Sequence, residues 1–296
     1  MSRMREKKYV AKLERAKIFD NTYREKIPQT AIAKICEAHA GKGKNCKVLL
    51  IAFDAVRPDA LLNIVTSSDR EKYPYSENVP GSGIGLIKQE GGLYFCYTGG
   101  DPNRKETWQE SSTIPGFATI LSGKWCTEHH VRTNNDGFEF CADTFLLNCA
   151  RAGKRVSFNA AWDAFFDCLF KKEKDLQLEN YSFQKSTKDC ETFDNIKQSI
   201  LRGDEVIFGI FENPDNNGHR YIFRNQNHAY VKAVIDSDRY AYALIETARQ
   251  NFPEDDWLFM IVTDHGGHMY RHGTRRPEDL ITFIASNKKI SGVGKC

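Results

Sequence analysis

The chain has 296 residues, of which 41% are hydrophobic and 27% charged, and its mean hydropathy is -0.54. This composition predicts a soluble protein with one large core or two modest ones, and no apolar run approaches the ~20 residues needed to cross a bilayer. The net charge of +3 is too small to favour binding to a nucleic acid duplex.

Nine cysteines are scattered along the chain, and none of them forms a C-x-x-C pair. The charged N-terminus, Met1–Lys8, has no apolar segment behind it, so no secretory signal is expected. We therefore expect reduced thiols in a cytoplasmic protein. A secreted, disulfide-bonded form whose signal has been removed is the alternative.

Residues 1–46 are predicted to form an N-terminal helical extension. Tyr9, Leu13 and Ala16 recur at helical spacing among many charges, and residues 30–39 form a second helical stretch. A basic amphipathic helix of this kind either touches a membrane or a partner, or packs against the main domain with a solvated face, and we expect packing against the main domain.

Strand and helix patterns alternate along the rest of the chain. Short apolar runs predict strands at residues 48–53, 91–97, 155–160, 206–211, 257–262 and 280–285. Helices are predicted from residue 59 and at residues 114–121, 141–152 and 227–251. This alternation predicts an α/β fold, a three-layer α/β/α sandwich with a mostly parallel central sheet. Residues 66–90 and 167–205 are polar and irregular, and are predicted to be insertions over the active edge.

Two of the predicted strands deliver metal-ligand side chains at their carboxyl ends. The run 48–53 is followed by Asp54, and the run 257–262 is followed, after one threonine, by Asp264 and His265. Ligands of open α/β sheets bind at this edge. A buried strand that ends in Asp or Asp-His holds metal ligands rigidly, so the pattern predicts a metalloenzyme.

Further carboxylate and imidazole groups follow other strands. Asp215 and His219 lie in the segment N-P-D-N-N-G-H, and His272 comes shortly after the Asp-His pair. Together the groups supply three carboxylates and three imidazoles, enough for two divalent ions ~4 Å apart. The glycine between Asp215 and His219 predicts a loop that turns both side chains toward one ion. The alternative is an Asx-turn beside a surface histidine.

Thr113, in the segment S-S-T-I-P-G-F, is the candidate nucleophile. A hydroxyl attacks poorly at neutral pH, so Thr113 needs a metal that holds it as an alkoxide and is therefore also a candidate ligand. It precedes Pro115 and a predicted helix, whose first N–H groups can receive phosphate oxygens. Ser111 and Ser112 are the alternative hydroxyls.

In this order the motifs resemble those of the alkaline phosphatase superfamily, in particular its type I phosphodiesterase/nucleotide pyrophosphatase branch. The resembling elements span most of residues 47–285. They are Asp54 with Arg57, the strand at 91–97, Thr113-Ile-Pro115, Leu121-Ser-Gly123, His130-Val131 with Asn134-Asn135, Pro214–His219, Thr263–Gly267 and His272-Gly273.

The resemblance implies a complete site. One ion would be bound by Asp215, His219 and His272, and the other by Asp54, Asp264 and His265. Thr113 would bridge toward the second ion and form a phosphothreonine that water then hydrolyses. Asn135 and His268 are expected substrate contacts, and His272 is preferred to His268 as the ligand because His-Gly matches the family pattern. Zinc is the expected metal, with manganese as the alternative.

The activity implied for residues 47–296 is hydrolysis of a small-molecule phosphoric ester, of the phosphodiesterase/nucleotide pyrophosphatase type. Alternatives are a phosphomonoesterase, a phosphonate hydrolase, a phosphoryl or phosphoethanolamine transferase, and a non-catalytic binding module that keeps the fold. Gly116 stands where nucleotide pyrophosphatases of this branch usually carry asparagine, which makes nucleotide substrates less secure. Thr113 and Phe117 do not match the C-x-P-x-R setting of sulfatases, so that activity is disfavoured.

Overall fold

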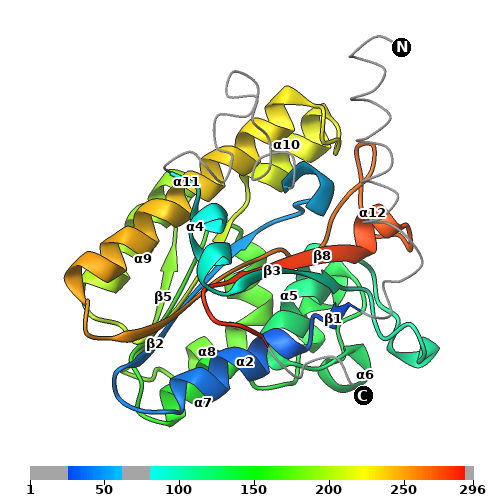
Figure 1. Cartoon of the computed structure of the whole chain (residues 1–296). Helices are drawn as coiled ribbons and strands as arrows, with labels where there is room; N and C mark the ends of the chain where they lie inside the picture. The colour runs from blue at the N-terminus through cyan, green and yellow to red at the C-terminus, as the bar shows by residue number, and fades with distance from the viewer. Residues whose placement is uncertain (1–25, 62–80, 291–296) are drawn as a thin grey trace.

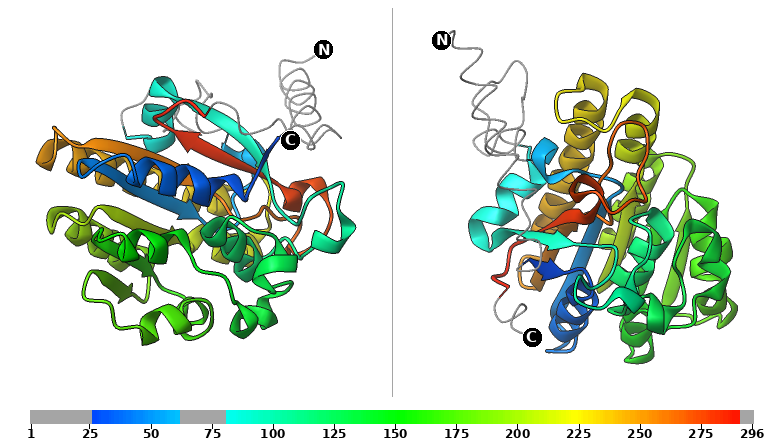
Figure 2. Two further views of the ribbon diagram at one scale, coloured as in Figure 1. Left: turned by 90° about the horizontal axis from the view of Figure 1, so that it is seen from below. Right: turned by 90° about the vertical axis from the view of Figure 1, so that its right-hand side faces the viewer.

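The computed structural model describes residues 26–61 and 81–290. In this part of the chain an eight-stranded sheet lies between two layers of helices (Figure 1 and Figure 2). The strand order is β1-β3-β8-β7-β2-β6-β4-β5, and neighbouring strands are parallel except that β8 runs antiparallel to both β3 and β7. The predicted three-layer sandwich with a mostly parallel sheet is confirmed.

The strands are β1 (Ile27–Pro28), β2 (Cys46–Phe53), β3 (Gly92–Tyr97), β4 (Val156–Ala160), β5 (Tyr181–Lys185), β6 (Val206–Phe211), β7 (Asp256–Val262) and β8 (Ile281–Ser286). One face of the sheet packs against α2 (Ala31–Ala40), α5 (Thr113–Ser122), α7 (Phe145–Arg151) and the π-helical segment η4 (Phe165–Leu169). The other face packs against α4 (Gly83–Glu90), α9 (Asp189–Leu201) and α11 (His228–Asn251). Shorter elements are η2 (Lys105–Thr107), α6 (Cys126–His129), η3 (Asn134–Glu139), α8 (Lys171–Asp175), α10 (Asn213–Tyr221) and α12 (Pro277–Leu280).

The central strands are apolar throughout because helices cover both of their faces. In β2, Leu50 and Ala52 point into the core beneath α2 and α5, whereas Ile51 and Phe53 point into the core beneath α11. Burial on both faces is the condition under which a strand reads as a continuous apolar run rather than an alternating one. The polar residue that ends such a run is therefore displayed at the edge of the sheet.

The predicted boundary at residue 46 does not separate two structures among the described residues. β1 pairs with β3, and α2 packs beneath β2 in the main core. Residues 1–25, with the helical spacing noted there, lie outside the described residues. None of the helices in the described ranges combines the length and apolar character that a bilayer-spanning segment needs.

The segment 167–205 is not an irregular insertion, which corrects the prediction. It contains α8, the edge strand β5, and α9, which packs on β6. Of the other predicted insertion, 66–90, residues up to 80 lie outside the described part, and its end forms α4 on the face of the sheet. The eight cysteines in the described ranges are free thiols.

Candidate metal centre

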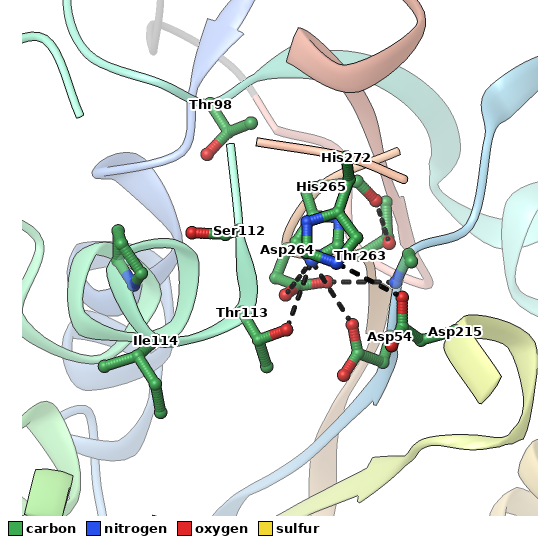
Figure 3. A network of polar contacts seen from close by, with 12 residues as sticks. Asp54, Thr98, Ser112, Thr113, Ile114, Asp215, Thr263, Asp264, His265 and His272 are labelled. Carbon is green, nitrogen blue, oxygen red and sulfur yellow. Dashed lines mark hydrogen bonds and ion pairs between the residues drawn. The ribbon is translucent and has the colours of Figure 1, made fainter. Parts of the chain in front are cut away.

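Six side chains predicted as metal ligands converge at the carboxyl edge of three adjacent parallel strands, β7, β2 and β6. Figure 3 shows Asp54, Asp215, Asp264, His265 and His272 there. The two predicted sets are described separately, and Asp215 lies close to members of both. The first ligand set is Asp215, His219 and His272, and the second ligand set is Asp54, Asp264 and His265. Asp54 directly follows β2, Asp264 and His265 follow β7, Asp215 and His219 come from α10 after β6, and His272 from the loop after β7.

Asp215 and His219 lie on helix α10 and not on the predicted loop. A spacing of four residues places both side chains on one face of the helix. Gly218 has a different role from the one predicted, because a Cβ at this position would overlap the ring of Phe223. The glycine lets Phe223 pack against the helix rather than letting a loop turn.

The three ligand atoms of the first ligand set are spaced as in a tetrahedral metal site. The Nε2 atom of His219 lies 3.4 Å from Oδ1 of Asp215, and Nε2 of His272 lies 3.6 Å from the same oxygen and 3.1 Å from Nε2 of His219. Tetrahedral zinc with bonds of about 2.0–2.1 Å has ligand–ligand distances of about 3.3 Å. The three atoms fit such an ion.

In the second ligand set, both carboxylates lie close to the Nε2 atom of His265. This atom lies 3.5 Å from Oδ1 of Asp54 and 3.3 Å from Oδ2 of Asp264. The hydroxyl of Thr113, at the start of α5, lies 3.3 Å from the same nitrogen. Because ligand atoms of Asp54, Asp215 and His265 lie within 4.8 Å of one another, the two sets adjoin.

Backbone carbonyls fix the tautomer of two of the histidines. Nδ1 of His265 lies 2.7 Å from the carbonyl oxygen of Gly266, and Nδ1 of His219 lies 2.8 Å from that of Tyr270. A carbonyl only accepts, so each Nδ1 carries the proton and each Nε2 presents a lone pair. This is the outer-shell arrangement that orients metal-binding imidazoles.

Buried carboxylates crowd the centre. Burial, followed by the charges of Asp264 and Asp215, raises the pKa of Asp54 well above its usual value, and burial likewise raises the pKa of Asp264. Burial raises the pKa of Asp215 to about 6, while burial and then His219 lower the pKa of His272 to about 4. A bound cation would lower the raised pKa values of the carboxylates and would keep the imidazole neutral, because positive charge stabilises ionised carboxylates beside neutral imidazoles.

Three buried carboxylate oxygens at this place have no hydrogen-bond partner among the described residues: Asp54 Oδ1, Asp215 Oδ1 and Asp264 Oδ2. The three residues follow three different strands, and each of these oxygens faces an imidazole of its own ligand set. An unpaired buried carboxylate is costly unless a cation or donor satisfies it. The donor set of nitrogen and oxygen atoms therefore fits a pair of divalent ions.

Asn134, and not the predicted Asn135, contacts the start of the helix that carries Thr113. Its Oδ1 accepts a 2.9 Å hydrogen bond from the backbone N–H of Ile114. Both asparagines are exposed, and the backbone N–H of Asn135 donates to Oγ1 of Thr133, the N-cap of η3. The sequence motif alone does not reveal which of the two side chains bonds to α5.

His268, the other predicted substrate contact, is held by two neighbouring side chains. It is buried, its Nδ1 lies 2.7 Å from Oδ1 of Asp279, and its Nε2 accepts a 3.3 Å hydrogen bond from Nε of Arg271. Both ring nitrogens are therefore engaged. Of the two candidate histidines, His272 is the one that faces Asp215.

A third group of potential ligands, His39, Cys46 and Asp256, lies at the opposite edge of the sheet, where strands begin. The Nε2 of His39 is bonded to the backbone carbonyl of Asp256 at 2.7 Å, and the Asp256 carboxylate pairs with Lys288. Cavities of about 290 and 330 Å³ at this edge are both lined by Asp256 and Lys288. These potential ligands already have partners of their own.

No family model matches the chain, and no curated protein matches it. Solved structures do match. The murine ectonucleotide pyrophosphatase/phosphodiesterase 5 is 17% identical over 74% of this chain and 57% of its own, with a TM-score of 0.51, and its inactive threonine-to-alanine variant in complex with AMP gives 0.52. The lipoteichoic acid synthase LtaP from Listeria monocytogenes is 10% identical over 88% of this chain and 73% of its own, with a TM-score of 0.55.

A protein in the alkaline phosphatase superfamily from Vibrio parahaemolyticus is 11% identical over 91% of this chain and 69% of its own, with a TM-score of 0.51. The chain thus spans a little over half, 57%, of the length of the murine protein. At these identities the matches show a shared fold.

Proposed function

We propose that this chain, which has an alkaline phosphatase-like fold, is a metal-dependent hydrolase of phosphoric esters with Thr113 as its nucleophile. The observation that carries the proposal is the convergence of three carboxylates and three imidazoles beside the Thr113 hydroxyl. Each ligand set would hold one divalent ion, and the mixed nitrogen and oxygen donors suit zinc.

When bound, the ions would supply positive charge that stabilises the entering and leaving oxygens. Thr113 attacks phosphorus through Oγ1, the bond from phosphorus to the leaving oxygen breaks, and water then hydrolyses the phosphothreonine. Thr113 starts α5, so the amino end of that helix favours the negative charge of the phosphate. Asn134, fixed through Oδ1 to Ile114, keeps its amide N–H groups for the phosphate oxygens.

The comparisons support this chemistry at the level of analogy. The murine neighbour is named a nucleotide pyrophosphatase/phosphodiesterase, and its inactive variant replaces a threonine by alanine. In the present chain Gly116 stands three residues after Thr113, where nucleotide pyrophosphatases of the resembling branch usually carry asparagine, and a Cβ there would lie 3.0 Å from Cβ of Asp264, so a side chain would crowd that residue. We therefore propose phosphodiester cleavage without assigning a nucleotide to the leaving group.

The match to the Listeria protein, which is named a synthase, favours a transferase as a second candidate function. In a transferase the same phosphothreonine passes its group to an alcohol instead of water. Product analysis in the presence of increasing glycerol separates the two. A hydrolase releases the same product at all glycerol concentrations, whereas a transferase yields a glycerol ester in growing proportion.

The direct test compares Thr113→Ala with the wild type on bis-p-nitrophenyl phosphate, p-nitrophenyl phosphate and a phosphonate ester. We expect the diester to be cleaved fastest, chelator to abolish turnover, and Thr113→Ala to lose at least about 1,000-fold in kcat while keeping its metal. Ser112→Ala, at the neighbouring hydroxyl, is the matched control and should retain activity. Undiminished turnover by Thr113→Ala refutes the proposal.

A further inference from the structure

We propose that Asp279, a carboxylate outside both ligand sets, is a positioning residue that holds His272 and the segment before Thr113 in register with each other. The inference rests on the proposed function, because its consequence is the affinity of the first ligand set for its ion. Asp279 lies on α12 and is fully buried. Nothing in the ligand pattern of the sequence singled it out.

Three oxygen atoms of Asp279 accept hydrogen bonds from three residues of one loop. Its Oδ1 receives the 2.7 Å hydrogen bond from Nδ1 of His268, and its Oδ2 accepts from the backbone N–H of Thr274 at 3.0 Å and from its Oγ1 at 2.6 Å. Its backbone carbonyl accepts from the N–H of Gly266 at 3.0 Å. The loop between Gly266 and Thr274 is thus fixed at its beginning, near its middle and at its end.

His272 lies on the portion of this loop between His268 and Thr274. His268 and Arg271 exchange backbone hydrogen bonds of 2.9 and 3.1 Å, which close a tight turn directly before His272. Nδ1 of His219 donates a hydrogen bond to the carbonyl oxygen of Tyr270, which lies in the same turn. Displacing the turn therefore shifts the imidazole of His272 and loosens the bond that orients His219.

The end of the loop is joined to the nucleophile segment. Oγ of Ser111 donates to the carbonyl of Thr274 at 2.6 Å, and the N–H of Gly273 donates to the carbonyl of Ser111 at 2.9 Å. Ser111 precedes Thr113 by two residues. Asp279 therefore connects, through Thr274, the loop of a metal ligand with the segment that places the attacking hydroxyl.

The second ligand set does not depend on Asp279 in this way. Asp54 and Asp264 are held at the ends of the central strands β2 and β7, and Oδ1 of Asp264 accepts the N–H of Ala55 at 3.2 Å. Loss of the Asp279 carboxylate should therefore weaken one ion and spare the other. A general loss of packing would weaken both.

Asp279→Asn is the variant that tests the inference. The amide keeps the shape but turns one acceptor into a donor, which then faces either Nδ1–H of His268 or the donors of Thr274. We expect zinc affinity at the first ligand set to fall 10- to 100-fold, roughly the effect of losing an outer-shell partner, with the second ion retained. We also expect kcat to fall more than KM changes.

Asp238→Asn is the matched control. Asp238 is also fully buried, and its Oδ1 accepts the N–H of Ile84 at the start of α4, on the helical layer away from the loop. Both variants lose one buried carboxylate, so a merely structural role lowers the melting temperature in each. Only Asp279→Asn should change the zinc affinity.

Thr274→Ala is the second variant, in case Asp279→Asn does not fold. It removes a single bond to the same carboxylate and should lower the affinity for the same ion to a smaller extent.

Zinc titration against a competing chelator, with turnover measured on the same samples, separates the two proposals. Two ions bound at wild-type affinity in Asp279→Asn overturn the positioning role, even if the wild type is an active esterase. A wild type that binds two ions but cleaves no ester refutes the proposed function, and the zinc affinity of Asp279→Asn still decides the inference. A wild type that binds no zinc refutes both.

Discussion

Gly116 and Gly218 lie where a side chain would push apart elements that carry the site. A Cβ on Gly116 would crowd Asp264, and one on Gly218 would overlap the ring of Phe223. Gly218 immediately precedes His219, so the packing of Phe223 against α10 also sets the place of that imidazole. These two positions require glycine because neighbouring atoms approach the backbone closely, and not because of an unusual backbone angle.

Gly218→Ala should destabilise the protein although it improves the helix. Alanine is favoured over glycine in a helix interior by about 1 kcal/mol, whereas overpacking a filled site costs about 1–3 kcal/mol. Because the added Cβ meets a buried ring, we expect a net loss of up to about 2 kcal/mol in the free energy of unfolding and weaker zinc binding. Denaturant unfolding of the metal-free protein measures the first effect.

Asn216→Ala on the same helix is the control, because Asn216 is exposed. It should leave stability within about 0.5 kcal/mol of the wild type. If Gly218→Ala is as stable as Asn216→Ala, the packing argument for this glycine is wrong.

The candidate ligands were predictable from the sequence for a physical reason. Asp54 follows β2 directly and Asp264 follows β7 after one residue, and both strands are buried on both faces, so their position in the chain fixes their position at the sheet edge. The contact of Asn134 with α5 could not be distinguished from one by Asn135, since the two asparagines are adjacent in the sequence. The contact between His268 and Asp279 could not be predicted, because Asp279 lies on a different element and carries no pattern that reveals it.

At the scale of elements, helix α10 was predicted as a loop. Its sequence, N-P-D-N-N-G-H-R-Y, is rich in residues that favour turns. Pro214 in the first turn is compatible with a helix, and packing against α11 outweighs the weak local preference. Tertiary contacts of this kind cannot be derived from the segment alone.

The elements α8, β5 and α9 were missed because their apolar residues are few and interspersed with polar ones. β5 is an edge strand whose residues after Tyr181 are partly buried or exposed. In α9 the apolar residues at helical spacing, Phe193, Ile196 and Ile200, alternate with polar residues of which Asp189, Thr192 and Ser199 are also buried, so the apolar face is weakly marked. Patterns of hydrophobicity identify central elements well and edge elements poorly.

Glu173 on α8 stabilises the start of α7 and should make stability depend on pH. Its carboxylate accepts from the N–H and Oγ1 of Thr144, which caps α7, and from the hydroxyl of Tyr181. Burial raises its pKa from 4.5 to about 7. Between these values the folded protein keeps a proton that the unfolded chain releases, so stability falls as pH rises.

Glu173→Gln cannot release this proton and should remove that part of the pH dependence. Between pH 4.5 and 7 the wild type should lose up to about 3 kcal/mol in the free energy of unfolding relative to the variant. Denaturant titrations of both proteins at several pH values within this range measure the difference. Curves that stay parallel would show that Glu173 is ionised throughout.

At the scale of the whole molecule, topology explains how residues more than two hundred positions apart meet. The order β7-β2-β6 places three parallel strands side by side, and their carboxyl ends bring Asp264, Asp54 and Asp215 together. The fold that the motifs predict is shared by the matching structures. Strand direction was less accessible, since an apolar run such as β8 reads the same whether it is parallel or antiparallel.

X-ray data collected on both sides of the zinc absorption edge, from crystals grown with zinc, test the central claim most directly. The account predicts two anomalous peaks about 4 Å apart, one within each ligand set, with the oxygen of Thr113 next to the second. A single peak, or peaks only at other places such as beside Cys46, would contradict it.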